Sequence, residues 1–381
     1  MDEESRQSAL DALKVLDTPP DERVDRITRL AQQIFGVPMV SVNLLDRDRQ
    51  WRKSEIGLGV REVPRADAFC EATIAQTGTL VIEDAAQDAF YASNPFVLGD
   101  PHLRFYAGHP LQAPCGEHVG TLCMLDTEPR TLDASQRDLL KDLAVWVQTE
   151  LAQQQELDHA AVVQRALTPR DLPQPDGYTV TAGSAPAGSV SGDFHDVRLR
   201  DDQLRITLAD VMGKGTGAGI IASAVRASMR TAPERSLLTT VAEIDSILEH
   251  DIGDLHMFVT LFCADVDTRT GVVSYVDGGH SLSFILRADG TWEHLNSTGL
   301  PLAMGMGDAH GLGTVQLNPG DALMSCSDGL LDLLDLEDPF GQVDEILAEY
   351  GIDGAVKEAL RRALAVKAAD DVTVLVVRRD S

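Results

Sequence analysis

Aspartates recur in this sequence where short apolar runs, which predict strands, begin or end. They are Asp193 in SGDF, Asp210 in LADVMGKG, Asp328 in SCSDGL, and Asp370 with Asp371 before VTVLVV. When strand ends converge, several carboxylates within a few ångström cannot all ionise unless a cation offsets their repulsion. Ligand sets made of oxygen favour Mg²⁺ or Mn²⁺ over zinc, whose sites prefer His and Cys. Two such ions about 3.5–4 Å apart could activate a shared water against a phosphoryl group.

Each of these motifs also has an interpretation that involves no metal ion. A single aspartate beside a glycine is more often a turn residue than a ligand, so the metal interpretation depends on the aspartates acting together. The glycine-rich segment at 213–219 is not a P-loop, because Gly215 stands where Ser or Thr must follow Gly-Lys. The segment at 265–271 begins like a calcium loop but has Arg269 at its fifth position and no glycine at its sixth, so we interpret it as a hairpin turn.

The second half of the chain supplies the strands that carry these aspartates. Apolar runs typical of strands occupy residues 204–210, 257–266, 272–279, 283–290 and 321–328. Residues 219–250 predict two helices, and residues 352–366 predict another. Tight glycine turns between neighbouring strands imply antiparallel pairing, and apolar helix faces need a sheet to cover. The pattern favours an α+β fold with a sheet sandwich flanked by helices over a parallel, doubly wound fold.

These segments also resemble a known family. The matching motifs are, in order, SGDFHDV (191–197), LADVMGKGTGAG (208–219), MFVTLFCADVDTRTGVVSYVDGGH (257–280), STGLPLAMG (297–305), SCSDGLLD (325–332) and DDVTVLVV (370–377). They resemble the PPM-type serine/threonine phosphatases, and more closely their SpoIIE/RsbU-like branch. The resemblance implies an α-β-β-α sandwich, which we assign to residues 168–381.

The resemblance also implies roles for individual residues of the site. The residues expected to be both catalytic and metal-binding are Asp193, Asp210, Asp328 and Asp370. Asp210 would bridge two Mn²⁺ or Mg²⁺ ions, and the backbone carbonyl of Val211 would bind one of them. Asp328 and Asp370 would hold the other ion, while Asp193 would join through the first ion or its water shell.

Several positions depart from the family pattern or carry weaker expectations. Asp196 and Asp371 are expected to support the ligands from outside the direct coordination. Eukaryotic relatives carry a His two residues after the bridging Asp, whereas this chain has Met212, as is usual in the SpoIIE-like branch. The leaving group would then be protonated by metal-bound water or left unassisted. His195 and His280 are alternative proton donors that the sequence supports only weakly.

The first third of the chain predicts a small domain in which a helix packs against an antiparallel sheet. Apolar residues at helical spacing over 24–34 precede a strand-like run at 38–46. This region resembles a GAF domain over residues 8–150. The segments that carry the resemblance are LDTPPDERVDRITRLAQQIFGVPMVSVNLLD, RQWRKSEIGL, RADAFCEATI, NPFV, PHLRFYAGHPL and HVGTLCMLD.

The ligand of this GAF-like region is unknown from the sequence. The Asn-Lys-Phe-Asp-Glu pattern of cyclic-nucleotide binders is absent, and Cys70 is followed by Glu71 instead of the His common at bilin-linked cysteines. We favour packed, reduced thiols, with a redox, haem or bilin role for Cys70, Cys115 or Cys123 as the alternative. The five cysteines are odd in number and include no C-x-x-C pair, so neither a disulfide framework nor a zinc ribbon is indicated.

A long helix is predicted between the two domains. Residues 133–167 contain neither Gly nor Pro, and Asp133 is placed to cap the helix. The helix could simply lie on its own domain. Because more than thirty residues is long for a globular helix, we favour a signalling helix or dimer seam and predict a homodimer. We expect it to transmit the state of the first domain to the helices at 219–250, which would then complete or break the metal site.

Composition limits the partners. The chain has 381 residues and a formal net charge of −28, which disfavours binding to nucleic acid or to anionic lipid. The N-terminus is acidic where a secretory signal needs basic residues, and no run of 18 apolar residues occurs, so we predict a soluble cytoplasmic protein.

Together these observations predict a GAF-regulated, Mn²⁺- or Mg²⁺-dependent protein serine/threonine phosphatase. By resemblance, its substrate would be a phosphorylated STAS-domain antagonist of an anti-sigma factor, in a partner-switching pathway. The alternatives are a non-catalytic ligand sensor that binds a partner through a phosphatase-like domain, and a phosphohydrolase acting on a small phosphate ester. The presence of every expected metal ligand favours the catalytic interpretation.

Overall fold

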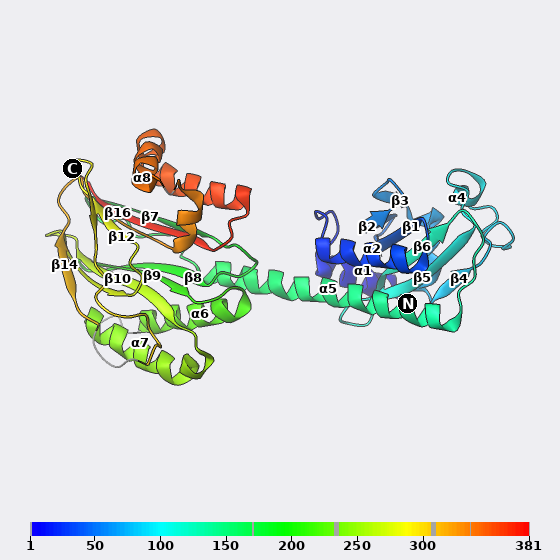
Figure 1. Cartoon of the computed structure of the whole chain (residues 1–381), viewed down its shortest axis with the longest axis horizontal. Coiled ribbons are helices and arrows are strands. Elements are labelled where there is room, and N and C mark those ends of the chain that lie inside the picture. The colour runs from blue at the N-terminus through cyan, green and yellow to red at the C-terminus, as the bar shows by residue number, and fades with distance from the viewer. Residues whose placement is uncertain (1, 170, 232–235, 306–309, 336, 381) are drawn as a thin grey trace. The chain divides into compact units, whose positions relative to one another are not determined.

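A computed structural model describes the chain apart from residues 1, 170, 232–235, 306–309, 336 and 381 (Figure 1). It divides into two compact units, Met1–Glu156 and Leu157–Ser381. Both units combine helices with antiparallel sheets, which confirms the predicted α+β class. Within the described residues, no helix is long and apolar enough to cross a membrane.

The first unit is built on a six-stranded antiparallel sheet with the order β3-β2-β1-β6-β5-β4. Its strands are β1 (Met39–Leu45), β2 (Arg49–Ile56), β3 (Glu62–Pro64), β4 (Leu80–Ile82), β5 (Phe105–Gln112) and β6 (His118–Asp126). One face is covered by α1 (Glu3–Leu13), α2 (Glu22–Phe35) and the beginning of α5 (Ala134–Leu167). The other face is covered by the short helices α3 (Cys70–Ile74) and α4 (Pro95–Leu98). The central strands β1 and β6 are buried along their whole length, as expected for strands covered on both faces.

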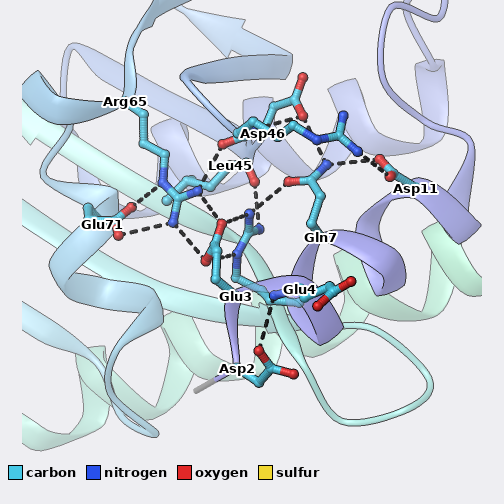
Figure 2. Close-up of polar contacts among 11 residues, drawn as sticks. Asp2, Glu3, Glu4, Gln7, Asp11, Leu45, Asp46, Arg65 and Glu71 are labelled. Carbon is cyan, nitrogen blue, oxygen red and sulfur yellow. Dashed lines mark hydrogen bonds and ion pairs between the residues drawn. The ribbon is translucent and has the colours of Figure 1, made fainter.

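A buried arginine attaches α1, which was not predicted from the sequence, to this sheet. Arg6 is fully buried, and its guanidinium donates hydrogen bonds to the carbonyl oxygen of Leu45 at 2.6 Å and to Glu3 at 2.7 Å. Glu3 also accepts from Arg65, which in turn binds Glu71 (Figure 2). Hydrogen bonds from Arg6 and then Arg65 lower the pKa of Glu3 to about 2. The charge of the buried guanidinium is therefore fully partnered.

The predicted long helix is confirmed as α5. Asp133 and Gln136 cap it reciprocally: Oδ1 of Asp133 accepts from the backbone N–H of Gln136 at 2.8 Å, and Oε1 of Gln136 accepts from the N–H of Asp133 at 3.0 Å. Leu140, Val147 and Leu151 are buried in the core of the first unit, so the N-terminal part of α5 lies on that unit.

The second unit contains two five-stranded antiparallel sheets. The first has the order β14-β11-β10-β9-β8, with β8 (Asp193–Arg200), β9 (Gln203–Val211), β10 (Val259–Asp267), β11 (Val272–Gly278) and β14 (Gly313–Gln316). The second has the order β13-β12-β15-β16-β7, with β7 (Tyr178–Ala185), β12 (Ser283–Leu286), β13 (Trp292–His294), β15 (Ala322–Cys326) and β16 (Val372–Arg379).

Helices cover the outer face of each sheet of the second unit, and a separate core fills the space between the sheets. The helices α6 (Thr216–Thr231) and α7 (Leu237–Ile252) pack on the first sheet. The helix α8 (Pro339–Val366) packs on the second and is interrupted at Gly351, whose φ is 65°. The predicted α-β-β-α sandwich is thereby confirmed (Figure 1). The predicted helix at 352–366 corresponds to the part of α8 that follows this interruption.

Candidate metal centre

Strand pairing places two of the predicted ligands opposite each other. β8 and β9 pair antiparallel with Asp193 directly across from Asp210. Cross-strand partners share a face of the sheet, with Cβ atoms about 4.5–5.5 Å apart. Val197 and Ile206 lie on the same face and belong to the core between the two sheets. Asp193 and Asp210 therefore face the second sheet from the end of the first.

The second sheet brings the other two predicted ligands to its corresponding edge. β15 and β16 pair antiparallel with Cys326 opposite Val374, so the end of β15 lies beside the start of β16. Asp328 opens the 3₁₀ turn η3 (Asp328–Leu333) just after β15, and Asp370 lies two residues before β16. The charge of Asp370 helps to raise the pKa of Asp328, after burial as the larger cause.

The electrostatics of these carboxylates indicate a shortage of positive charge. Asp193 is only 5% exposed, and burial followed by the charge of Asp210 raises its pKa well above the usual range. Burial and then the charges of Asp328 and Asp370 raise the pKa of Asp210 to about 6. Oδ2 of Asp193 is buried and has no hydrogen-bond partner among the described residues. An all-carboxylate group of this kind fits a hard divalent cation.

A lysine partly balances the group. Nζ of Lys214 lies 3.0 Å from Oδ2 of Asp370 and donates to the carbonyl oxygen of Ala369. Within the described part of the chain, no three His, Cys, Asp or Glu side chains stand close enough together to hold one ion as they are. The carboxylates would therefore have to draw closer to bind an ion. Val211, whose carbonyl is the fifth predicted ligand, is buried at the end of β9, and its N–H donates to the carbonyl of Gly192 at 3.3 Å.

The two predicted supporting aspartates differ in position. Asp371 lies beside the group, where its charge acts on Asp193 and Asp210. It accepts hydrogen bonds from the backbone N–H groups of Ala187 at 2.7 Å and Gly192 at 2.6 Å, so it fixes the loop that leads into Asp193.

Asp196 is not brought into the carboxylate group. It lies on the opposite face of β8, where it is buried and forms ion pairs with Arg230 at 2.7 Å and Arg226 at 3.4 Å, both on α6. Adjacent positions along a strand alternate between faces, so Asp193 and Asp196, three residues apart, point in opposite directions. Through these ion pairs, Asp196 attaches α6 to β8.

The two histidines considered as proton donors are both buried. Burial lowers the pKa of His195 and of His280 to about 4, so both are neutral at pH 7. Nδ1 of His280 is 3.3 Å from the hydroxyl oxygen of Thr260, which fits a structural role in its turn. Neither histidine holds the proton that a general acid would donate near neutral pH.

We expect His280→Asn to make the second unit less sensitive to acid. A folded pKa near 4 against a usual value of 6.5 means that the unfolded chain binds more protons between these pH values, so the wild type loses stability as pH falls from about 6.5 to 4. The difference between these two pKa values corresponds to roughly 3 kcal/mol of stability, which the variant should not lose. Thermal unfolding measured from pH 7 to 4 checks this; equal acid sensitivity in both proteins would contradict it.

Two residues that contact the site were not identified from the sequence. Lys214 was considered only as part of the rejected P-loop motif, although its position four residues after Asp210 was an available signal. Gln164, near the end of α5, accepts from the N–H of Ser191 at 2.8 Å and donates to its carbonyl at 2.6 Å. Nothing local in the sequence predicts this contact, because 27 residues separate the partners.

Comparisons with known proteins match two separate parts of the chain. The profile of the family Stage II sporulation protein E (SpoIIE) matches residues 200–380, and that of the GAF domain matches residues 19–151. The phosphoserine phosphatase RsbU of Bacillus subtilis is 26% identical over 237 residues, which cover 59% of this chain and 70% of RsbU. The cyclic di-GMP phosphodiesterase PA2567 of Pseudomonas aeruginosa is 41% identical over 129 residues, which cover 34% of this chain but 22% of that protein. The chain thus spans about a fifth of the length of PA2567. The solved SiaA-PP2C domain of Pseudomonas aeruginosa shares the fold at a TM-score of 0.50 and 21% identity, over 61% of this chain and 99% of that domain.

Proposed function

Because the chain carries a GAF domain over residues 19–151 and a SpoIIE-family domain of the PPM phosphatases over residues 200–380, we propose that it is a cytoplasmic, metal-dependent protein serine/threonine phosphatase. The observation that carries the proposal is the group of four carboxylates at the adjoining edges of the two sheets, of which Asp193 is buried, Asp210 and Asp370 are half-buried and Asp328 is exposed. Three of them, Asp193, Asp210 and Asp328, have raised pKa values. Two Mn²⁺ or Mg²⁺ ions bound there would supply a water activated for attack on a phosphoryl group.

In this proposal, some residues of the chain hold the metal ions and others shape the site around them. Asp210 and the carbonyl of Val211 would hold ions from the first sheet, and Asp328 and Asp370 would hold them from the second. Asp193 joins through the side chain oxygen that lacks a partner among the described residues. Lys214, which pairs with Asp370 at 3.0 Å, would be close enough to bind the substrate phosphate if Asp370 held an ion instead. With both nearby histidines neutral, the leaving group receives its proton from water.

The proposed substrate is a phosphorylated STAS-domain protein that antagonises an anti-sigma factor. The similarity to RsbU, a phosphoserine phosphatase by name, supports a phosphoserine or phosphothreonine substrate. A chain with a net charge of −28 does not attract a phosphoprotein through its general field. Specificity therefore has to come from a docked surface, while the metal ions supply local positive charge.

One assay tests the proposal and separates it from its alternatives. The full chain is incubated with a phosphorylated STAS-domain protein, with free phosphoserine and with nucleotides, each in Mn²⁺ or in chelator, and released phosphate is measured. We expect Mn²⁺-dependent release from the phosphoprotein only. Release from the small esters alone would identify a different phosphohydrolase, and binding without release under every condition would identify a non-catalytic regulator.

We further propose that α5 regulates the site through the contact between Gln164 and Ser191. The side chain amide of Gln164 makes both hydrogen bonds to the backbone of Ser191, two residues before Asp193. Gly219 of α6 packs against the same loop, because a Cβ there would lie 2.2 Å from Cγ1 of Val190. The end of α5, the loop and the start of α6 are thus in direct contact. In a homodimer formed along α5, this helix would also contact the α5 of the second copy of the chain.

Gln164→Ala is expected to weaken the metal site without removing any ligand. Loss of both hydrogen bonds frees the loop before Asp193, and residues that orient ligands typically change metal affinity by about 10–100-fold. The Mn²⁺ concentration for half-maximal activity should rise by about tenfold or more. Gln153→Ala, at an exposed position of the same helix, is the matched control and should leave this concentration unchanged. An unchanged Mn²⁺ requirement in Gln164→Ala would contradict the coupling.

A further inference from the structure

A cavity of about 310 Å³ in the first unit is lined by two cysteines and by two polar side chains, each of which has one buried atom without a hydrogen-bond partner among the described residues. The cysteines are Cys70, the first residue of α3, and Cys123 on β6. The polar side chains are those of Gln50 and Arg52 on β2, which are 5% and 6% exposed. Oε1 of Gln50 and Nε of Arg52 have no hydrogen-bond partner within the described ranges of the chain. Because an unpaired buried polar atom is costly, these atoms indicate that a small polar molecule enters the cavity.

The two sulfur atoms meet over one face of β1 and β6. Ser41 pairs with Cys123 and Asn43 pairs with Thr121, so these four residues share that face. Nδ2 of Asn43 lies 3.0 Å from Sγ of Cys123 and 3.4 Å from Sγ of Cys70. The hydroxyl of Thr121 donates to Sγ of Cys70 at 3.1 Å. A single amide nitrogen therefore contacts both sulfurs, and α3 packs directly on β6. Because both sulfurs lie within 3.4 Å of the same nitrogen, the two thiols are neighbours on this face, as a disulfide requires.

We propose that Cys123 and Cys70 form an intramolecular disulfide when hydrogen peroxide enters this cavity. The cavity is large enough, since a water molecule occupies about 30 Å³ and a peroxide has two oxygen atoms. Hydrogen peroxide is both a donor and an acceptor, so it can donate to Oε1 of Gln50 and accept from Nε of Arg52. The thiol pair is thus a modification site of the GAF domain, and it does not depend on the proposed phosphatase function.

The chemistry balances with one peroxide for each pair of thiols. The thiolate of Cys123 attacks one peroxide oxygen, the O–O bond breaks, and the departing hydroxide takes a proton to become water. Cys123 is then a sulfenic acid. The sulfur of Cys70 attacks the sulfur of Cys123, the S–S bond forms, and the second hydroxide leaves with the proton of the Cys70 thiol as water. The two thiols lose two electrons in total, and the peroxide is reduced to two waters.

The surroundings explain why Cys123 is assigned the first step. Its sulfur is close to the amide of Asn43 and to the hydroxyl of Ser41 at 3.4 Å. The neighbouring Cys70 thiol, these donors and the charge of Arg52 outweigh burial and lower the pKa of Cys123 to about 7. Arg52 donates through Nη1 to the carbonyl oxygen of Val60 at 2.6 Å, and its positive charge favours the thiolate of Cys123. Burial raises the pKa of Cys70, which therefore keeps the proton that the second step needs.

The test uses the full chain carrying Cys115→Ser, which removes the exposed cysteine and serves as the reference protein. After treatment with hydrogen peroxide, thiols are counted in denaturant and the digested protein is analysed by mass spectrometry. We expect a loss of two thiols per chain, a peptide pair linked through Cys70 and Cys123, and recovery of both thiols with dithiothreitol. Retention of both thiols at peroxide concentrations that oxidise Cys115 in the wild type would overturn the proposal.

Three variants in the reference protein assign the steps. Cys70→Ser should stop at a sulfenic acid on Cys123 that dimedone traps, whereas Cys123→Ser should leave Cys70 reduced. Arg52→Gln should slow the loss of thiols at pH 7 by about fivefold, as expected if the pKa of Cys123 rises from about 7 by about one unit. Trapping on Cys70 in place of Cys123 would contradict the assigned order. If a serine variant does not fold, as judged by circular dichroism, the linked peptide in the reference protein still decides the proposal.

Discussion

Asp328→Asn is expected to lower the Mn²⁺-dependent release of phosphate by about 10³-fold while leaving the fold intact. The asparagine keeps the size of the side chain but removes a charge from the carboxylates that would hold the ions. Loss of an ion would remove several kcal/mol of transition-state stabilisation, and about 4 kcal/mol corresponds to this factor. Asp328 lies at the edge of the sandwich in the turn η3, so the substitution empties no core position. Turnover at saturating Mn²⁺ is the measurement.

The matched control for this prediction is Asp289→Asn. Asp289 lies in the exposed turn between β12 and β13, where it caps the turn by accepting from the N–H of Thr291 at 3.0 Å. The same change of side chain there should leave turnover unchanged. Retained activity of Asp328→Asn with manganese, in a protein whose circular dichroism matches the wild type, would refute the assignment of Asp328 as a metal ligand.

Asp210→Asn is expected to stabilise the second unit in chelator and to abolish its stabilisation by Mn²⁺. The folded pKa of Asp210, about 6, exceeds the usual 3.8 by about two units, so ionising this carboxyl in the fold costs roughly 3 kcal/mol at pH 7. The asparagine avoids this cost. The melting temperature in chelator should therefore rise by several degrees, whereas added Mn²⁺ should raise it only in the wild type.

The pH dependence of this difference has a definite sign. Because the folded pKa is raised, the folded state binds more protons than the unfolded chain between about pH 4 and 6. Stability of the wild type in chelator must then fall as pH rises through this window, relative to the variant. Calorimetry should find the two proteins similar at pH 4 and furthest apart above pH 6. A difference that shrinks as pH rises would show that like-charge repulsion at Asp210 is not the cause.

Elements with strong periodic patterns were predictable from the sequence, and those that depend on distant contacts were not. The helix α5 followed from its length and from Asp133 at its start. The first part of α8, by contrast, was not predicted. It begins at Pro339 after the cap at Asp338 and ends at Gly351, whose positive φ breaks the helical pattern. The helix α1 was also missed, and one of the contacts that attach it to the sheet joins Arg6 to Leu45, which is 39 residues away in the sequence.

The same distinction applies to the candidate site. The family motifs indicated the four aspartates, and the antiparallel hairpins already implied that their strand ends could converge. The motifs did not show on which face of its strand each side chain lies. Asp196 falls in the same motif as Asp193, yet the alternation of β8 turns it to the arginines of α6. Asp371 and Gln164 fix one loop through backbone groups, and these contacts leave no residue pattern in the sequence.

The ion pairs of Asp196 with Arg226 and Arg230 couple the position of α6 to that of β8. These ion pairs hold α6 against β8. Separating the two elements would leave the carboxylate of Asp196, which is only 3% exposed, buried without a partner, at a cost of about 3–5 kcal/mol. A sliding or rolling movement of α6 is therefore more easily accommodated by carrying β8 along. Since Asp193 projects from the reverse side of that strand, a movement of α6 that carried β8 along would also displace the carboxylate of Asp193.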